Sequence, residues 1–101
     1  MTAVGDKFVL EAHALANNGT LAVQPASGYE ATIHNIMYNQ AVQFFANSPS
    51  TTSFMYDSDG TAGARLGLVQ DVNNTYYITV KNVSGSAAAE IVVTGVYTKT
   101  P

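Results

Sequence analysis

The stretch Thr75–Asn82, with the sequence TYYITVKN, decides the fold class. Its side chains fall into two alternating sets, Tyr76, Ile78 and Val80 on one side and Tyr77, Thr79 and Lys81 on the other. A period of two is typical of a β-strand, because successive side chains point to opposite faces of a sheet. Turn-forming residues precede and follow the stretch, at Val72-Asn73-Asn74 and Ser84-Gly85-Ser86. The stretch therefore predicts a half-buried strand between two turns.

The same alternation recurs along the chain in short segments, separated by clusters of Gly, Pro, Asn, Asp and Ser. Turns spaced roughly every 8–12 residues are typical of sandwiches and small barrels. We expect one all-β domain over residues 1–101, an antiparallel β-sandwich of about eight strands with a jelly-roll or immunoglobulin-like topology. The expected strands are 6–14, 20–24, 29–38, 41–46, 52–56, 65–70, 75–82 and 89–99.

Two pairs of adjacent aromatic residues add a prediction about the surface. Neighbouring side chains on a strand face opposite ways, so Phe44-Phe45 and Tyr76-Tyr77 each place one ring on either face. We expect at least one ring of each pair in the core. The other ring is exposed or covered by a neighbouring subunit, and the low charge of the chain favours the neighbour.

Composition excludes several classes of protein. Of the 101 residues 47% are hydrophobic and only 11% charged, with a net charge of −3 and no cysteine. Without cysteine there are no disulfides, no thiol catalysis and no cysteine zinc site. Four Lys/Arg residues argue against a nucleic-acid surface. No apolar run approaches the roughly 18–20 residues of a membrane helix, and Met1–Gly5 does not resemble a secretory signal.

The segment Asp57-Ser58-Asp59-Gly60 resembles the opening of a calcium-binding loop. The complete loop needs a bidentate Glu at its twelfth position, where this chain has Leu68. Asp and Gly are also ordinary β-turn residues. We therefore expect a plain turn here, and the sequence leaves open whether Asp57 and Asp59 bind calcium.

Two histidines are the candidates for acid–base chemistry. His13 stands two residues from Glu11, and His34 stands four residues from Glu30 on the expected strand face. A triad would need a positioned nucleophile, and no Gly-x-Ser-x-Gly elbow is present. We expect both histidines to face solvent, and we assign no catalytic, cofactor-binding or metal-binding residue and no enzyme activity. Three glycosylation sequons, at Asn18, Asn73 and Asn82, are interpreted as chance occurrences.

Four segments together carry a resemblance to a known group of proteins, and they span roughly residues 29–98. They are Thr32–Ile36, Tyr56–Ala64, Tyr77–Asn82 and Thr94–Val96. This part of the chain resembles the small virion structural proteins of tailed bacteriophages, of the capsid-decorating or fibre-like kind. The strand expected at residues 6–14 lies outside the resemblance. No residue of functional importance is carried over from it.

The resemblance implies a non-enzymatic protein that decorates or cements a capsid through protein–protein contacts. The implied partner is the major capsid protein or another virion protein, with no nucleic acid and no membrane. We expect a homo-oligomer, with a trimer favoured over a dimer, on the exterior of the virion after synthesis in the host cytoplasm. The alternative is a host-adsorption or carbohydrate-binding module that uses exposed aromatic rings.

Overall fold

The computed structural model describes residues 2–49 and 51–101, apart from the side chains of residues 51 and 52. Its secondary structure in these residues consists of strands and turns. The strands are β1 (Lys7–Leu15), β2 (Thr20–Val23), β3 (Glu30–Tyr38), β4 (Val42–Ser48), β5 (Thr51–Asp59), β6 (Gly63–Arg65), β7 (Gln70–Asn73), β8 (Tyr77–Asn82) and β9 (Ala89–Lys99).

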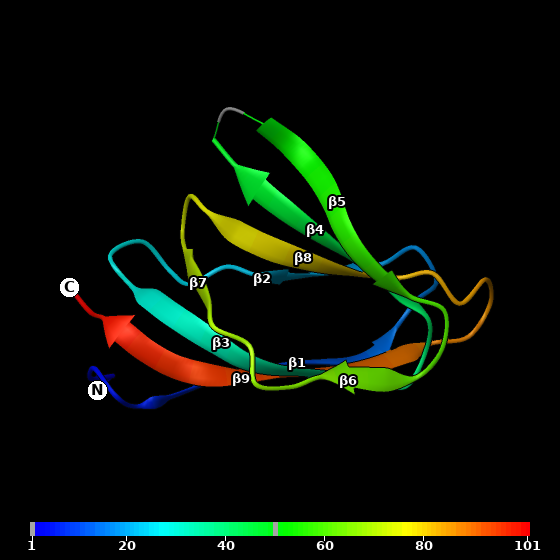
Figure 1. Ribbon diagram of the computed structural model, residues 1–101, viewed down its shortest axis with the longest axis horizontal. Helices are drawn as coiled ribbons and strands as arrows, with labels where there is room; N and C mark the ends of the chain where they lie inside the picture. Colours follow the sequence, from blue (N-terminus) through cyan, green and yellow to red (C-terminus); the bar gives the residue numbers. More distant parts are fainter. Residues whose placement is uncertain (1, 50) are drawn as a thin grey trace.

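The strands form two antiparallel sheets that face each other (Figure 1). Sheet A has the order β1-β9-β3-β6, and β7 also pairs with β3. Sheet B has the order β2-β8-β4-β5. The all-β sandwich expected from the period of two is therefore confirmed.

The strand pairing is nested, as if the whole chain were folded into one long hairpin. β1 pairs with β9, β2 with β8, β3 with both β6 and β7, and β4 with β5. β6 lies against residues 36–38 of β3 and β7 against residues 30–33, so the two are segments of one interrupted strand. Nested pairing of eight strand positions across two sheets is the jelly-roll arrangement. Of the two topologies expected, the structure has this one.

The core lies between the sheets and is built from the inward sets of the alternating strands. On β8 it takes Ile78 and Val80, the set that the deciding stretch predicts. Phe44 is also in the core, whereas its neighbour Phe45 is half-buried on the opposite face. The buried apolar residues are Phe8, Val23, Ala31, Ile33, Ile36, Tyr38, Val42, Phe44, Val72, Ile78, Val80, Ala89, Ile91 and Val93.

Gly95 marks the closest approach of β9 to β3. It pairs with Phe8 on one side and Ile33 on the other, where the register of β3 shifts between Ile33 and Asn35. A Cβ atom at this position would lie 2.1 Å from the carbonyl oxygen of Thr32. Only glycine therefore fits between these strands.

Three expectations about strand boundaries are wrong. The segment 65–70 is not one strand, because residues 66–69 leave the sheet between β6 and β7. The turn expected at 72–74 falls later, at 74–76, because Val72 and Asn73 continue β7. β5 extends to Asp59, so residues 57–59 belong to a strand, and the connection to β6 is only residues 60–62. In the second and third cases pairing with a neighbouring strand overrode a local turn preference.

Candidate functional site

The sandwich is open along one side, where the outer strand of sheet B faces the interrupted outer strand of sheet A. Figure 1 shows β5 rising away from sheet A at this side. Because β6 and β7 have only three and four residues, sheet A offers little surface opposite β5. Phe54 on β5 is therefore 63% exposed. Val69, in the connection between β6 and β7, is 83% exposed.

His34 holds this connection against β3. The backbone N–H of Leu68 donates to the carbonyl of His34 at 2.8 Å, and His34 Nδ1 donates to the carbonyl of Leu68 at 3.0 Å. A carbonyl only accepts hydrogen bonds, so Nδ1 carries the proton. His34 is half-buried, so its ring is only in part exposed to the solvent that it was expected to face. Its expected companion Glu30 instead pairs with Lys99 at 3.6 Å.

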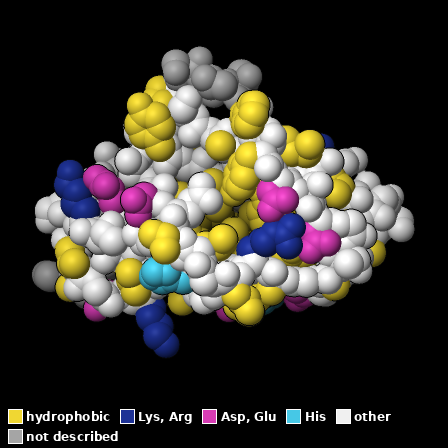
Figure 2. Space-filling view, viewed as in Figure 1, with side chains coloured by type: hydrophobic (Ala, Val, Ile, Leu, Met, Phe, Trp, Pro, Cys, Tyr) yellow, Lys and Arg dark blue, Asp and Glu magenta, His cyan; other side chains and the backbone are white. Residues whose placement is uncertain are grey.

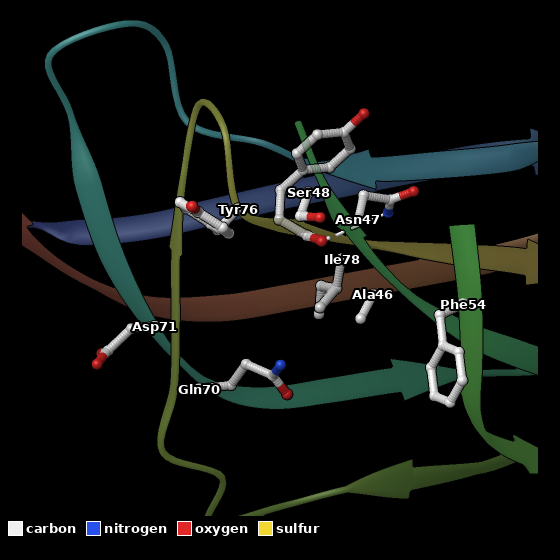
Figure 3. Close-up of a pocket in the computed structure, with 9 residues that line it drawn as sticks. Ala46, Asn47, Ser48, Phe54, Gln70, Asp71, Tyr76 and Ile78 are labelled. Atoms are coloured by element: carbon white, nitrogen blue, oxygen red, sulfur yellow. Dashed lines mark hydrogen bonds between the residues drawn. The ribbon is translucent and has the colours of Figure 1, made fainter. Parts of the chain in front are cut away.

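A groove of about 350 Å³ lies in the opening between the sheets. In Figure 3 Phe54 stands on one side of it and Tyr76 on the other, with Ala46 and Ile78 between them. Tyr76 is 59% exposed and its neighbour Tyr77 half-buried. Neither ring of this pair is in the core, contrary to expectation. Figure 2 shows apolar side chains gathered along the same side of the molecule.

The polar side chains around the groove are largely engaged within the fold. Asn47 Nδ2 donates to Thr79 Oγ1 at 2.7 Å, and Asn47 Oδ1 accepts from Ser53 Oγ at 2.6 Å. Asp71 is the only Asp, Glu, Lys or Arg that lines the groove within the described residues. Its Oδ1 accepts from Thr32 Oγ1 at 2.6 Å, and its carboxyl group points away from the apolar floor (Figure 3). The groove is thus an apolar surface with one acidic group at its rim.

Asp57 and Asp59 form an ion-pair cluster with Arg65. Arg65 Nε lies 2.9 Å from Asp57 Oδ2, and Arg65 Nη1 lies 3.4 Å from Asp59 Oδ2. The hydroxyl group of Tyr38 donates to Asp59 Oδ2 at 2.6 Å, and the guanidinium group lies 5.6 Å from the centre of the Phe44 ring. These bonds fasten β6 to the end of β5.

The ion pairs and hydrogen bonds of this cluster change the pKa of its members. The Arg65 guanidinium lowers the pKa of Asp57, and the hydrogen bond from Tyr38 lowers the pKa of Asp59. Burial and the bond to Asp59 raise the pKa of Tyr38 to about 12. A guanidinium group stands where a calcium ion would need carboxylate oxygens. Among the described residues, no group of three or more His, Asp or Glu side chains could hold a metal ion.

His13 lies between two carboxylates at the far edge of sheet A. Its Nε2 is 3.1 Å from Glu11 Oε2 and its Nδ1 is 3.3 Å from Glu90 Oε1. Both contacts raise the pKa of His13, the bond to Glu11 more than the bond to Glu90. Glu90 also accepts from the backbone N–H of Ala14, whose φ of 53° places it in the left-handed region beside a bulge in β1. His13 is exposed, as expected. Its two contacts join Glu11 of β1 to Glu90 of β9 near the end of β1.

The sequon at Asn82 is not accessible in the folded chain. Asn82 is fully buried, and its Nδ2 donates to the carbonyls of Leu15 and Ala87, both at 2.8 Å. Its Oδ1 accepts from the backbone N–H of Ser84 at 3.0 Å. This side chain ties the end of β8 to the end of β1 and to the connection between β8 and β9.

The groove is the site that sequence reasoning missed. Its walls come from segments far apart along the chain, and its shape depends on how the two sheets separate. The available signal is the apolar run Leu66-Gly67-Leu68-Val69, which belongs to the strand expected at residues 65–70. Gly63 precedes this run and Gly67 lies within it. They favour an interruption of the strand.

The geometry defines a small jelly-roll protein with an apolar groove along one open side. No family model matches the chain. No curated protein matches it either. Among solved structures it is similar to the Drosophila NLP core, whose structure was reported to give insight into pentamer formation and histone binding. The TM-score is 0.56 at 14% identity, over 92% of this chain and 98% of the NLP core. At this identity the likeness concerns the fold.

Residues 2–49 and 51–101 contain no helix with the length and apolar character needed to cross a bilayer.

Proposed function

We propose that this chain is a non-enzymatic structural protein of a phage virion, which decorates or cements the capsid through protein–protein contacts. The observation that carries the proposal is the open side of the sandwich. There the groove residues Phe54 and Tyr76 and the nearby Val69 leave a large apolar area in water. Soluble monomers rarely keep such an area uncovered, and it is typical of a surface that binds another protein.

Three further features support an assembly role. The chain has only 11% charged residues, so its surface has little electrostatic self-repulsion. A jelly roll is a fold that virus capsids use. The similar NLP core forms pentamers, which is a precedent for oligomers of this fold. The oligomer expected for a capsid protein is a trimer, and the mass of the particle in solution distinguishes three copies from five.

The test uses purified virions from the replicon that encodes this chain. Quantitative mass spectrometry should find the chain in a copy number that matches the symmetry of the capsid. Stripped shells should rebind the purified protein, and Phe54→Asp should weaken that binding at least tenfold. Thr98→Asp, an exposed polar position on β9, is the matched control and should bind like the parent chain. Absence of the chain from the particle would contradict the proposal.

A carbohydrate-binding module is the second candidate, favoured by the aromatic rings on both sides of the groove. Sugar rings bind by stacking on exposed aromatic faces, and Phe54 and Tyr76 offer two of them. A glycan array with and without a chelator tests this function. Specific glycan binding that is lost in Tyr76→Ala would favour adsorption to a host over capsid decoration.

A further inference from the structure

We propose that the groove receives the turn before β1 of a second copy of this chain, with Val4 in the groove and Lys7 paired to Asp71. The contact would join copies head to tail. The inference concerns the oligomer within the proposed function, and it can fail without affecting binding to a capsid.

The turn at residues 3–6 is a rigid apolar projection. The backbone N–H of Asp6 donates to the carbonyl of Ala3 at 3.0 Å, and the N–H of Ala3 donates to Asp6 Oδ2 at 2.9 Å. Gly5 adopts a φ of 91°, and its N–H donates to the carbonyl of Tyr97 at 2.8 Å. These bonds hold Val4 at the tip, where it is 63% exposed. Turn tips usually carry polar residues, so a fixed valine there fits a contact surface.

Charge complementarity selects this turn among the exposed apolar groups. Arg65 and Lys99 are already ion-paired, whereas Lys7 and Lys81 have no such partner among the described residues. Asp71 at the rim of the groove likewise pairs with no cation in that part of the chain. Lys7 follows Val4 by three residues, a span of at most about 10 Å. A copy that inserts Val4 can therefore bring an unpaired cation to an unpaired carboxylate.

The two surfaces lie on opposite edges of sheet A, which favours a head-to-tail assembly. The turn precedes β1, the strand at one edge, and Asp71 belongs to β7 at the other edge, in the sheet order β1-β9-β3-β6 with β7 beside β3. Different surfaces on the two partners make a heterologous contact, which closes into a ring when the rotation permits. A two-fold dimer would instead use the same surface twice.

The charge pair gives a direct test by light scattering on the purified chain without capsid. The parent chain should form a complex whose mass is a multiple of 10.6 kDa. Lys7→Asp and Asp71→Lys should each raise the dissociation constant at least tenfold, and the double reversal should restore it to within about threefold. Lys81→Asp, a reversal at the other unpaired lysine, is the matched control and should leave the mass unchanged.

Crosslinking tests the head-to-tail geometry, because the chain has no cysteine of its own. A chain with both Val4→Cys and Ser48→Cys places one thiol on the turn and one at the groove. On oxidation it should give a ladder of covalent oligomers that ends at the ring size. Circular dichroism confirms that each variant is folded.

Three outcomes would overturn the inference. They are a monomer at all concentrations, a double reversal that fails to restore association, or covalent dimers from Val4→Cys alone. A monomer that still rebinds stripped shells would leave the proposed function standing and assign the groove to a capsid segment. A ring that does not bind shells would support the head-to-tail contact and contradict the proposed function.

Discussion

His34 and Leu68 are joined by two hydrogen bonds, one from the Leu68 backbone to the His34 carbonyl and one from the His34 ring to the Leu68 carbonyl. Together they anchor the segment that interrupts the outer strand of sheet A. The position of Val69 beside the groove depends on this anchor, because Val69 follows Leu68 directly. A histidine expected to face solvent is thus part of the framework beside the groove.

Replacement of His34 by Ala should loosen this segment. One hydrogen bond is lost, so the free energy of unfolding should fall by about 1 kcal/mol in urea titration. Hydrogen exchange at the Leu68 amide should accelerate, because its bond to β3 is no longer held from the other side. His13→Ala is the control and should leave exchange at Leu68 unchanged. Equal exchange in both variants would show that the ring of His34 does not hold the segment.

The Asp57, Asp59 and Arg65 cluster predicts a loss of stability in acid. Both carboxyl groups have a pKa below their ordinary value of 3.8 in the folded chain. Their contribution is therefore present above 3.8 and is lost as the pH falls through the lowered values. The double variant Asp57→Asn, Asp59→Asn should be less stable than the parent near neutral pH, and the difference should vanish well below pH 3.8. The urea midpoints of the parent and the double variant, measured near neutral pH and below pH 3.8, test this prediction.

Calcium is the control for this cluster. Because Arg65 already satisfies both carboxylates, added calcium should not change the urea midpoint of the parent chain. A midpoint that rises with calcium would show that the ion displaces the guanidinium group.

His13 predicts a second, opposite pH dependence. Its pKa is raised above 6.5 because both ring nitrogens face carboxylates, and only the imidazolium form can donate to both. The contribution to stability is complete below 6.5 and is lost as the pH rises through the raised value. NMR titration of the His13 ring should show this pKa, and Glu11→Gln should lower it. A titration unaffected by Glu11→Gln would contradict the arrangement.

Gly95 predicts the most damaging small substitution. In Gly95→Ala the new methyl group would meet the backbone of β3, which cannot move without breaking the pairing with β9. The free energy of unfolding should fall by about 3 kcal/mol or more. Gly60→Ala is the matched control, since a Cβ there meets nothing within 4 Å. Gly60→Ala should leave the free energy of unfolding unchanged or raise it by at most about 1 kcal/mol.

Replacement of the buried polar side chain of Asn82 should cause a large loss of stability. Asn82→Ala leaves the carbonyls of Leu15 and Ala87 without the donor that they share, so unfolding should become easier by about 2–4 kcal/mol. Thermal and urea unfolding measure the loss. Asn74→Ala removes a longer bond, of 3.3 Å, from an exposed residue to Pro25, and it should cost less than about 1 kcal/mol. Equal losses at both positions would contradict the role given to Asn82.

Much of the sandwich was predictable because its strands depend on a local signal, the alternation of side chains. Ile78 and Val80 face the core as the pattern of Thr75–Asn82 predicts. The nested pairing was not predictable in this way, since it depends on which strands meet across the whole chain. The end of β5 was missed because Asp57-Ser58-Asp59 consists of turn residues, and only Arg65 and β4 explain why they form a strand.

The groove was even harder to predict from the sequence than the strand pairing. The sequence around Phe54 is that of an ordinary strand. Nothing near Phe54 in the chain shows that sheet A is interrupted opposite it. Tyr76 was placed on the deciding strand but lies in the turn before it. Its exposure follows from the later start of β8, at Tyr77.

The position of β9 has a consequence for how the chain folds as it is made. β9 lies between β1 and β3, so neither of these strands has its full set of partners until the ribosome has released Lys99. Sheet B, whose strands end at Asn82, can pair earlier. The nascent chain therefore carries the unpaired edges of β1 and β3 until late in synthesis. This topology therefore favours fast pairing of β9 once it has emerged, or a chaperone that covers these edges until then.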